Sequence, residues 1–330
     1  MEDIKEGVEI ALYYKRESST TALDPIKINK LAYLAIQKFN LEITFGWFKY
    51  GPAPVDTATR DGAKAGPELD LRPRPAREVS ASDYSRVPSE EHDHPSPEAY
   101  SEWFLQSDEF EEILNTKTKQ YLKEFYKEYA PERYKQLYLA SIGFQRHLEP
   151  IEREAAEDPD RDFPSVDDQY YEDLSKNLNN VYGELLKSPP LEESVEPFNS
   201  YKRLLKDVIA SASNEQNMPE QDMVFIGEVV EFFFTDAWRY VALLISEDTV
   251  RGANADRLRN SISSELANLR NQYDDDIGDL QSRAKLLGLL PTSKRVISKQ
   301  KNPYEHDFED ESSTDNLEQW ERLAAEVIDE

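Results

Sequence analysis

The sequence contains no cysteine. Disulfide bonds, zinc–thiolate sites and cysteine nucleophiles are therefore excluded, because each of them needs a cysteine sulfur. Three common catalytic signatures are missing as well: the G-x-S-x-G nucleophile motif, the phosphate-binding G-x-x-x-x-G-K-S/T loop and the dinucleotide-binding G-x-G-x-x-G. We therefore do not expect an enzyme, a cofactor or a metal ion.

Histidine is scarce, with four in 330 residues. His92 and His94 share one polar stretch, while His147 and His306 lie far from them in the sequence. The acidic run Asp274–Asp276 falls within a helical pattern, which points its three carboxylates to different faces. Solvated side chains are therefore a better interpretation of both stretches than a metal site.

Basic residues are few relative to acidic ones, with 39 Lys and Arg against 66 Asp and Glu and a net charge of −27. Such a surface repels nucleic-acid phosphates, so we do not expect nucleic acid as a partner. The locally basic segments Arg72–Arg77 and Ser293–Lys301 are interpreted as ordinary charge balance. A negative charge spread along the whole chain is typical of proteins from halophilic archaea, where salt screens self-repulsion.

No long apolar run is free of charge. The most apolar segment, Val224–Ile245, contains four charged residues, which favours a buried helix over a membrane span. The first residues are charged and amphipathic and do not resemble a signal peptide. The sequence thus predicts an intracellular, cytoplasmic protein with no membrane association.

The stretch Lys27–Val55 combines a helix pattern with a strand pattern. Asp24 can cap the first helical N–H groups, and Pro25 suits the first helical position. Apolar residues then recur at helical spacing, and after Asn40 the period changes to two until Gly51-Pro52 ends the strand. We expect a compact, buried helix–strand unit followed by a loop.

The run Lys30–Ala35 and the later run Trp47–Pro52 resemble the "K-L-x-Y-x-A … W-F/Y-K-H/Y-G-P" signature of the SocA-like antitoxin domain, also called Panacea. The chain departs from that family because a long proline-rich insertion follows Pro54, where the family continues into a short helix. The resemblance implies a protein that neutralises a partner, such as a toxin encoded nearby, or serves it as an adaptor. The interaction candidates that it implies are Lys30, Tyr33, Trp47, Lys49, Tyr50, Gly51 and Pro52. A core unit with no exposed function remains the alternative.

The fold class expected is mainly α. Residues 1–150 are predicted to form a multi-helix domain with one short β element and a proline-rich insertion at about 51–97. Residues 166–290 should form a helical bundle, and 291–330 a linker with a final amphipathic helix. The helices expected from residue 98 to 212 are Tyr100–Leu105, Glu109–Tyr129, Glu132 to about Glu157 with a kink or an end at Pro150, Gln169–Leu186 and Pro197–Ala212.

Two further apolar stripes indicate interaction surfaces. In the segment Leu258–Leu287, apolar residues recur with an eleven-residue repeat, which is typical of a long straight helix in a bundle or in a homo-oligomer. Near the C-terminus, the segment Asn316–Ile328 carries one apolar stripe that needs a surface to bury it. Its interaction candidates are Leu317, Trp320, Leu323 and Val327.

These patterns together favour an intracellular protein-binding module that resembles an antitoxin or an adaptor. The alternative is a self-associating helical structural protein of a halophile or of its mobile elements, assembled through the eleven-residue repeat.

Overall fold

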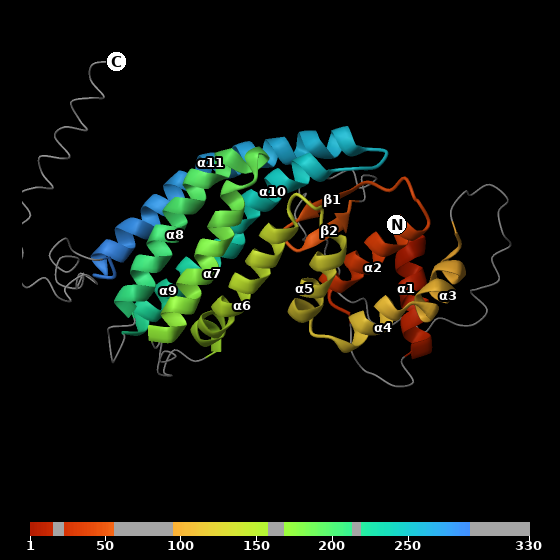
Figure 1. Ribbon diagram of the computed structural model, residues 1–330, viewed down its shortest axis with the longest axis horizontal. Helices are drawn as coiled ribbons and strands as arrows, with labels where there is room; N and C mark the ends of the chain where they lie inside the picture. The colour runs from red at the N-terminus through yellow and green to blue at the C-terminus, as the bar shows by residue number, and fades with distance from the viewer. Residues whose placement is uncertain (16–22, 56–94, 158–167, 213–218, 291–330) are drawn as a thin grey trace, which may run out of the picture. The chain divides into compact units, whose positions relative to one another are not determined.

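The computed structural model describes residues 1–15, 23–55, 95–157, 168–212 and 219–290, of which Figure 1 shows the arrangement. They belong to one compact unit, Met1–Leu290. These residues are mainly helical with one short hairpin, so the predicted fold class is confirmed. Four predicted features lie outside the described residues: most of the proline-rich insertion, His92 and His94, the basic segments Arg72–Arg77 and Ser293–Lys301, and the C-terminal stripe with Leu317, Trp320, Leu323 and Val327.

The N-terminal part contains helices α1 (Glu2–Lys15) and α2 (Pro25–Lys38). The predicted start of α2 is confirmed, because the Asp24 side chain accepts a hydrogen bond from the Lys27 N–H at 2.9 Å and Pro25 occupies the first turn. Apolar residues of α2 between Leu31 and Ile36 are buried. The helix therefore belongs to the core of this part of the chain.

Strands β1 (Phe45–Phe48) and β2 (Gly51–Pro54) pair antiparallel, with Phe45 opposite Pro54 and Phe48 opposite Gly51. The prediction that Gly51 begins a loop is therefore wrong. Gly51, with a φ of 87°, allows the chain to reverse direction into β2. Pro52 and Pro54 have no N–H to donate, and they are tolerated because β2, in a two-stranded sheet, has one edge that pairs with no strand.

Helices α3 (Pro97–Gln106), α4 (Asp108–Asn115), α5 (Thr118–Tyr129) and α6 (Lys135–Glu157) follow the insertion. The single helix expected over Glu109–Tyr129 is wrong, because the backbone is extended at Thr116 and Lys117. The Thr116 carbonyl leaves the helical ladder and accepts a hydrogen bond from the Lys27 Nζ at 2.7 Å. Helix α6 continues through Pro150, so this proline does not end it.

The remaining elements are mostly long helices, joined by one short 3₁₀ turn and one π-helical turn. They are α7 (Asp168–Leu186), η2 (Pro189–Leu191), α8 (Glu192–Ala212), α9 (Glu220–Phe232), the π-helical turn η3 (Phe233–Ala237), α10 (Trp238–Thr249) and α11 (Ala255–Leu286). The elements α9, η3 and α10 follow one another without a break and are apolar on most of their circumference, since other helices surround them.

The eleven-residue stripe of α11 is buried inside the chain, where α11 packs on α8 and α10. Its buried members are Leu258, Ile262, Leu266, Leu269, Tyr273, Ile277, Leu280 and Ala284. The chain's own helices therefore cover the stripe. The expected homo-oligomer through Leu258–Leu287 needed this stripe to be exposed, and it is not.

The hairpin connects the two parts that the sequence separates. Phe45 and Arg251 exchange both backbone hydrogen bonds at 3.0 Å, and β1 packs on α10. The domain division near residues 150–166 stays a prediction, although these contacts cross it. Within the described ranges, no helix is both long enough and apolar enough to cross a membrane.

Candidate functional site

The two signature runs, Lys30–Ala35 and Trp47–Pro52, contact each other through a buried lysine. Lys30 on α2 is 1% exposed, and its Nζ donates a hydrogen bond to the Pro52 carbonyl at 3.0 Å. The same Nζ lies 5.8 Å from the centre of the Phe125 ring. Burial lowers the pKa of the Lys30 ammonium to about 7, against the opposing effect of the Asp24 carboxylate.

Tyr33 and Trp47 lie in an aromatic cluster between α2, β1 and α5. The Tyr33 ring meets the Phe45 ring edge to face at 5.3 Å and the Trp47 ring at 5.8 Å. Trp47 is only 3% exposed, and it also contacts the rings of Phe125 and Tyr126. Tyr33 and Trp47 therefore pack in the core and stabilise the fold.

Side chains from α6 and α10 hold three consecutive carbonyl groups of the hairpin. The donors are Ser246 Oγ to the Trp47 carbonyl at 2.7 Å, Tyr138 OH to the Phe48 carbonyl at 2.8 Å, and Trp238 Nε1 to the Lys49 carbonyl at 2.9 Å. These donors come from positions far along the sequence, so the turn is fixed by tertiary contacts rather than by local propensity.

Gly51 is required by both its backbone and its surroundings. Its φ of 87° is in the left-handed region, which side chains other than glycine rarely adopt. A Cβ atom there would lie 2.9 Å from Cε1 of Tyr126 and 3.3 Å from Cε of Lys30. The backbone conformation and the close packing at this position together explain why residue 51 is a glycine.

Lys49 and Tyr50 are the two signature candidates that reach the surface, and both are partly exposed. The Lys49 Nζ lies 5.0 Å from the Tyr50 ring and 5.5 Å from the Phe234 ring. Burial raises the pKa of the Asp236 carboxyl, and the positive charge of Lys49 is among the smaller effects that oppose this rise. Lys49, although partly exposed, therefore contacts other side chains of the same chain.

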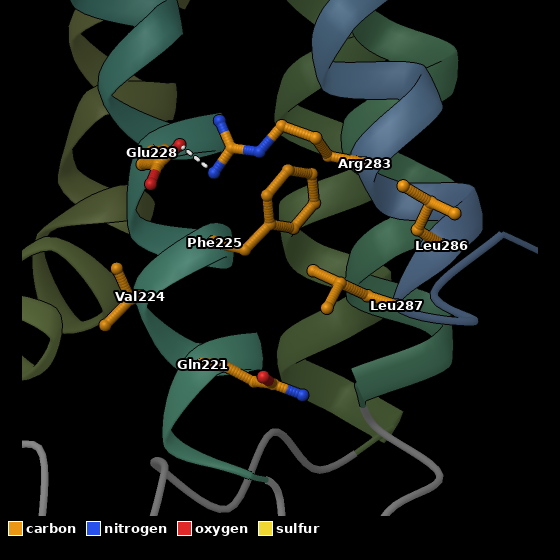
Figure 2. A pocket seen from close by; sticks show the side chains of 7 residues that line it. All are labelled: Gln221, Val224, Phe225, Glu228, Arg283, Leu286 and Leu287. Atoms are coloured by element: carbon orange, nitrogen blue, oxygen red, sulfur yellow. Dashed lines mark ion pairs between the residues drawn. The ribbon is translucent and has the colours of Figure 1, made fainter.

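A hollow between α9 and α11 is a candidate binding site that sequence reasoning missed. Figure 2 shows its lining, and its volume is about 450 Å³. The lining residues are Gln221, Val224, Phe225, Glu228, Arg283, Leu286 and Leu287. We call this the α9–α11 groove. Val224 and Leu286 are exposed apolar residues outside the buried positions of their helices, a signal that the sequence carries for each wall but that does not show that the two walls meet.

Arg283 connects the two walls of the α9–α11 groove. Its guanidinium pairs with Glu228 at 2.6 Å and lies 5.1 Å from the centre of the Phe225 ring (Figure 2). It also pairs with Asp279 on its own helix at 3.8 Å. The groove therefore has an apolar floor and a polar end.

Metal ligands do not gather in the described part of the chain, where no group of three or more His, Asp or Glu residues could hold an ion. Asp274, Asp275 and Asp276 are all exposed on α11.

No curated protein and no solved structure matches the chain. A family model does match, and it spans the hairpin, the groove and nearly all of the chain. The chain belongs to the family described as Domain of unknown function (DUF8098), whose model matches residues 1–316.

Proposed function

We propose that this protein is a protein-binding module that resembles the SocA-like antitoxins, and that it neutralises or presents a partner protein such as a toxin encoded nearby. The observation that carries the proposal is the direct contact between the two halves of the signature, through Lys30 Nζ and the Pro52 carbonyl and through the rings of Tyr33 and Trp47. Residues that resemble one family motif thus form one packed unit.

As part of the same proposal, the protein works in a salt-rich cytoplasm. A net charge of −27 produces strong self-repulsion in dilute buffer, and the screening length falls to roughly 3 Å at 1 M salt. A surface of this kind favours partners of opposite charge.

The self-associating alternative is less well supported. It depended on the stripe of α11, and residues such as Leu266 and Ile277 are covered by the chain's own helices. We therefore favour binding to a different protein.

The test is co-expression with the product of the neighbouring reading frame. We expect that product to be toxic alone and harmless with this protein, and we expect light scattering in about 2 M KCl to give the mass of a complex. A neighbour that is neither toxic nor bound contradicts the proposal. A large assembly of this chain alone supports the structural alternative.

A further inference from the structure

The α9–α11 groove has the geometry that accepts a helix. Its α9 wall consists of Gln221, Val224, Phe225 and Glu228, at the spacing i, i+3, i+4 and i+7. Its α11 wall consists of Arg283, Leu286 and Leu287, at the spacing i, i+3 and i+4. Each wall is thus one face of a helix, and a third helix laid between them presents apolar anchors at matching intervals.

The groove brings two of the exposed large apolar side chains of the described residues together. Val224 is 47% exposed and Leu286 is 86% exposed, while Phe225 forms a floor that is only 1% exposed. A cavity of about 150 Å³ holds one benzene ring, so a volume of about 450 Å³ has room for about three groups of that size. Two or three anchor side chains from one helix would fill it.

The charge around the groove favours a basic occupant. Within the lining, Glu228 and Arg283 balance each other, and Asp279, which lies beside the groove at 3.8 Å from Arg283, adds one negative charge. The whole chain adds its net charge of −27. Lysine or arginine on the flanks of a docked helix is therefore attracted at contact, and also at a distance when the salt concentration is low.

We propose that the α9–α11 groove binds an amphipathic helix of a partner protein, with apolar anchors at i, i+3 or i+4, and i+7 and with basic residues along its flanks. This inference rests on the proposed protein-binding function and names the surface that performs it. The hairpin is then the framework of the protein, and the groove is its contact surface.

The experiment titrates the full chain with a fluorescent helical peptide of about 18 residues, built from leucine at the anchor positions and lysine elsewhere. A second peptide carries glutamate in place of lysine. We expect the basic peptide to bind more tightly than the acidic one, and the double variant Val224→Glu with Leu286→Glu to weaken the basic peptide about tenfold or more. The matched control is Leu186→Glu, at a leucine that is 56% exposed on α7, and it should bind like the wild type.

Four outcomes overturn the inference. The first is a double variant that binds the basic peptide like the wild type, because binding is then general electrostatic attraction. The second is equal binding of the two peptides. The third is tighter peptide binding by the full-length variant Trp320→Ala, which makes the chain's own C-terminal segment the occupant. The fourth is a dimer that Leu286→Glu converts to a monomer, which makes a second copy the occupant.

Failure of this inference is distinguishable from failure of the proposed function. If the double variant still forms the complex with the neighbouring gene product, the proposed function is supported and the proposed role of the groove is contradicted. If the peptide binds in the groove but no such complex forms, the role of the groove is supported and the antitoxin-like function is contradicted.

Discussion

The Nζ atom of Lys30 donates a hydrogen bond to the carbonyl oxygen of Pro52 at 3.0 Å, in a position that is almost free of solvent. This contact connects the middle of α2 to the returning strand of the hairpin. It places a titratable amine in the core, and the stability of the protein should therefore depend on the protonation of one lysine.

Stability should rise with pH above neutrality, and Lys30→Met should reduce this rise. Burial lowers the folded-state pKa of Lys30 from 10.5 to about 7. Between these values the unfolded chain binds one proton more than the folded chain, so the free energy of unfolding increases with pH by at most about 1.4 kcal/mol per unit from this residue. Urea unfolding at about pH 7 and about pH 9.5 measures it.

The control for this substitution is Lys38→Met, at an exposed lysine on the same helix. It should keep the wild-type pH dependence. If the free energy of unfolding depends on pH equally in the wild type and in Lys30→Met, the protonation of Lys30 does not differ between the folded and the unfolded chain.

Trp47→Ala should lower the free energy of unfolding by about 3–5 kcal/mol, because it opens a cavity in the aromatic cluster. Trp47 is 3% exposed and contacts the rings of Tyr33 and Tyr138. Thermal melting in molar KCl is the measurement. Trp103→Ala, at a partly exposed position, should cost less, and equal losses in the two variants would contradict the central place given to Trp47.

Tyr138→Phe should destabilise the protein by about 1–3 kcal/mol, because it removes the hydrogen bond that the Tyr138 hydroxyl donates to the buried Phe48 carbonyl at 2.8 Å. Tyr14→Phe removes the same hydroxyl from a residue that is 65% exposed, and it should change nothing measurable. The comparison is made by chemical unfolding. If the two substitutions have the same effect, the Tyr138 hydroxyl does not stabilise the hairpin.

Dilution of salt should lower the melting temperature. The net charge of −27 repels itself across the surface, and the screening distance grows from roughly 3 Å at 1 M salt to about 10 Å at 0.1 M. Circular dichroism melts between about 2 M and 0.1 M KCl measure the shift. A melting temperature that does not move would remove the argument for adaptation to high salt.

Local signals predicted their elements correctly. The cap at Asp24 and the proline at position 25 determine the start of α2 through contacts within four residues, which is why the sequence reveals them. Eight of the nine stripe positions predicted on α11, from Leu258 to Ala284, are buried as their periodicity predicts, while the ninth, Leu287, is only partly buried and lines the groove.

Features set by distant residues were not predictable in the same way. Strand β2 contains Pro52 and Pro54, which argue against a strand, and it forms because it pairs with β1 and receives the Lys30 bond. The break between α4 and α5 falls at Thr116, whose carbonyl binds a lysine 89 residues away. The groove joins α9 to α11, so neither periodic segment reveals it alone.

The signature residues show that a sequence motif does not reveal which of its side chains are exposed. Five of the seven candidates that it implies are buried, and Lys49 and Tyr50 alone among them are partly exposed. Sequence reasoning treated all seven alike, because a motif does not reveal which side chains point into the core.

On the proposed function, this protein binds a partner through the α9–α11 groove while the hairpin serves as its framework. The most direct test titrates the neighbouring gene product into the wild type, into Leu286→Glu and into Lys49→Gln by calorimetry. The account predicts that Leu286→Glu weakens binding about tenfold or more with an unchanged melting temperature, and that Lys49→Gln has little effect. Binding that survives Leu286→Glu and is lost in Lys49→Gln would contradict it.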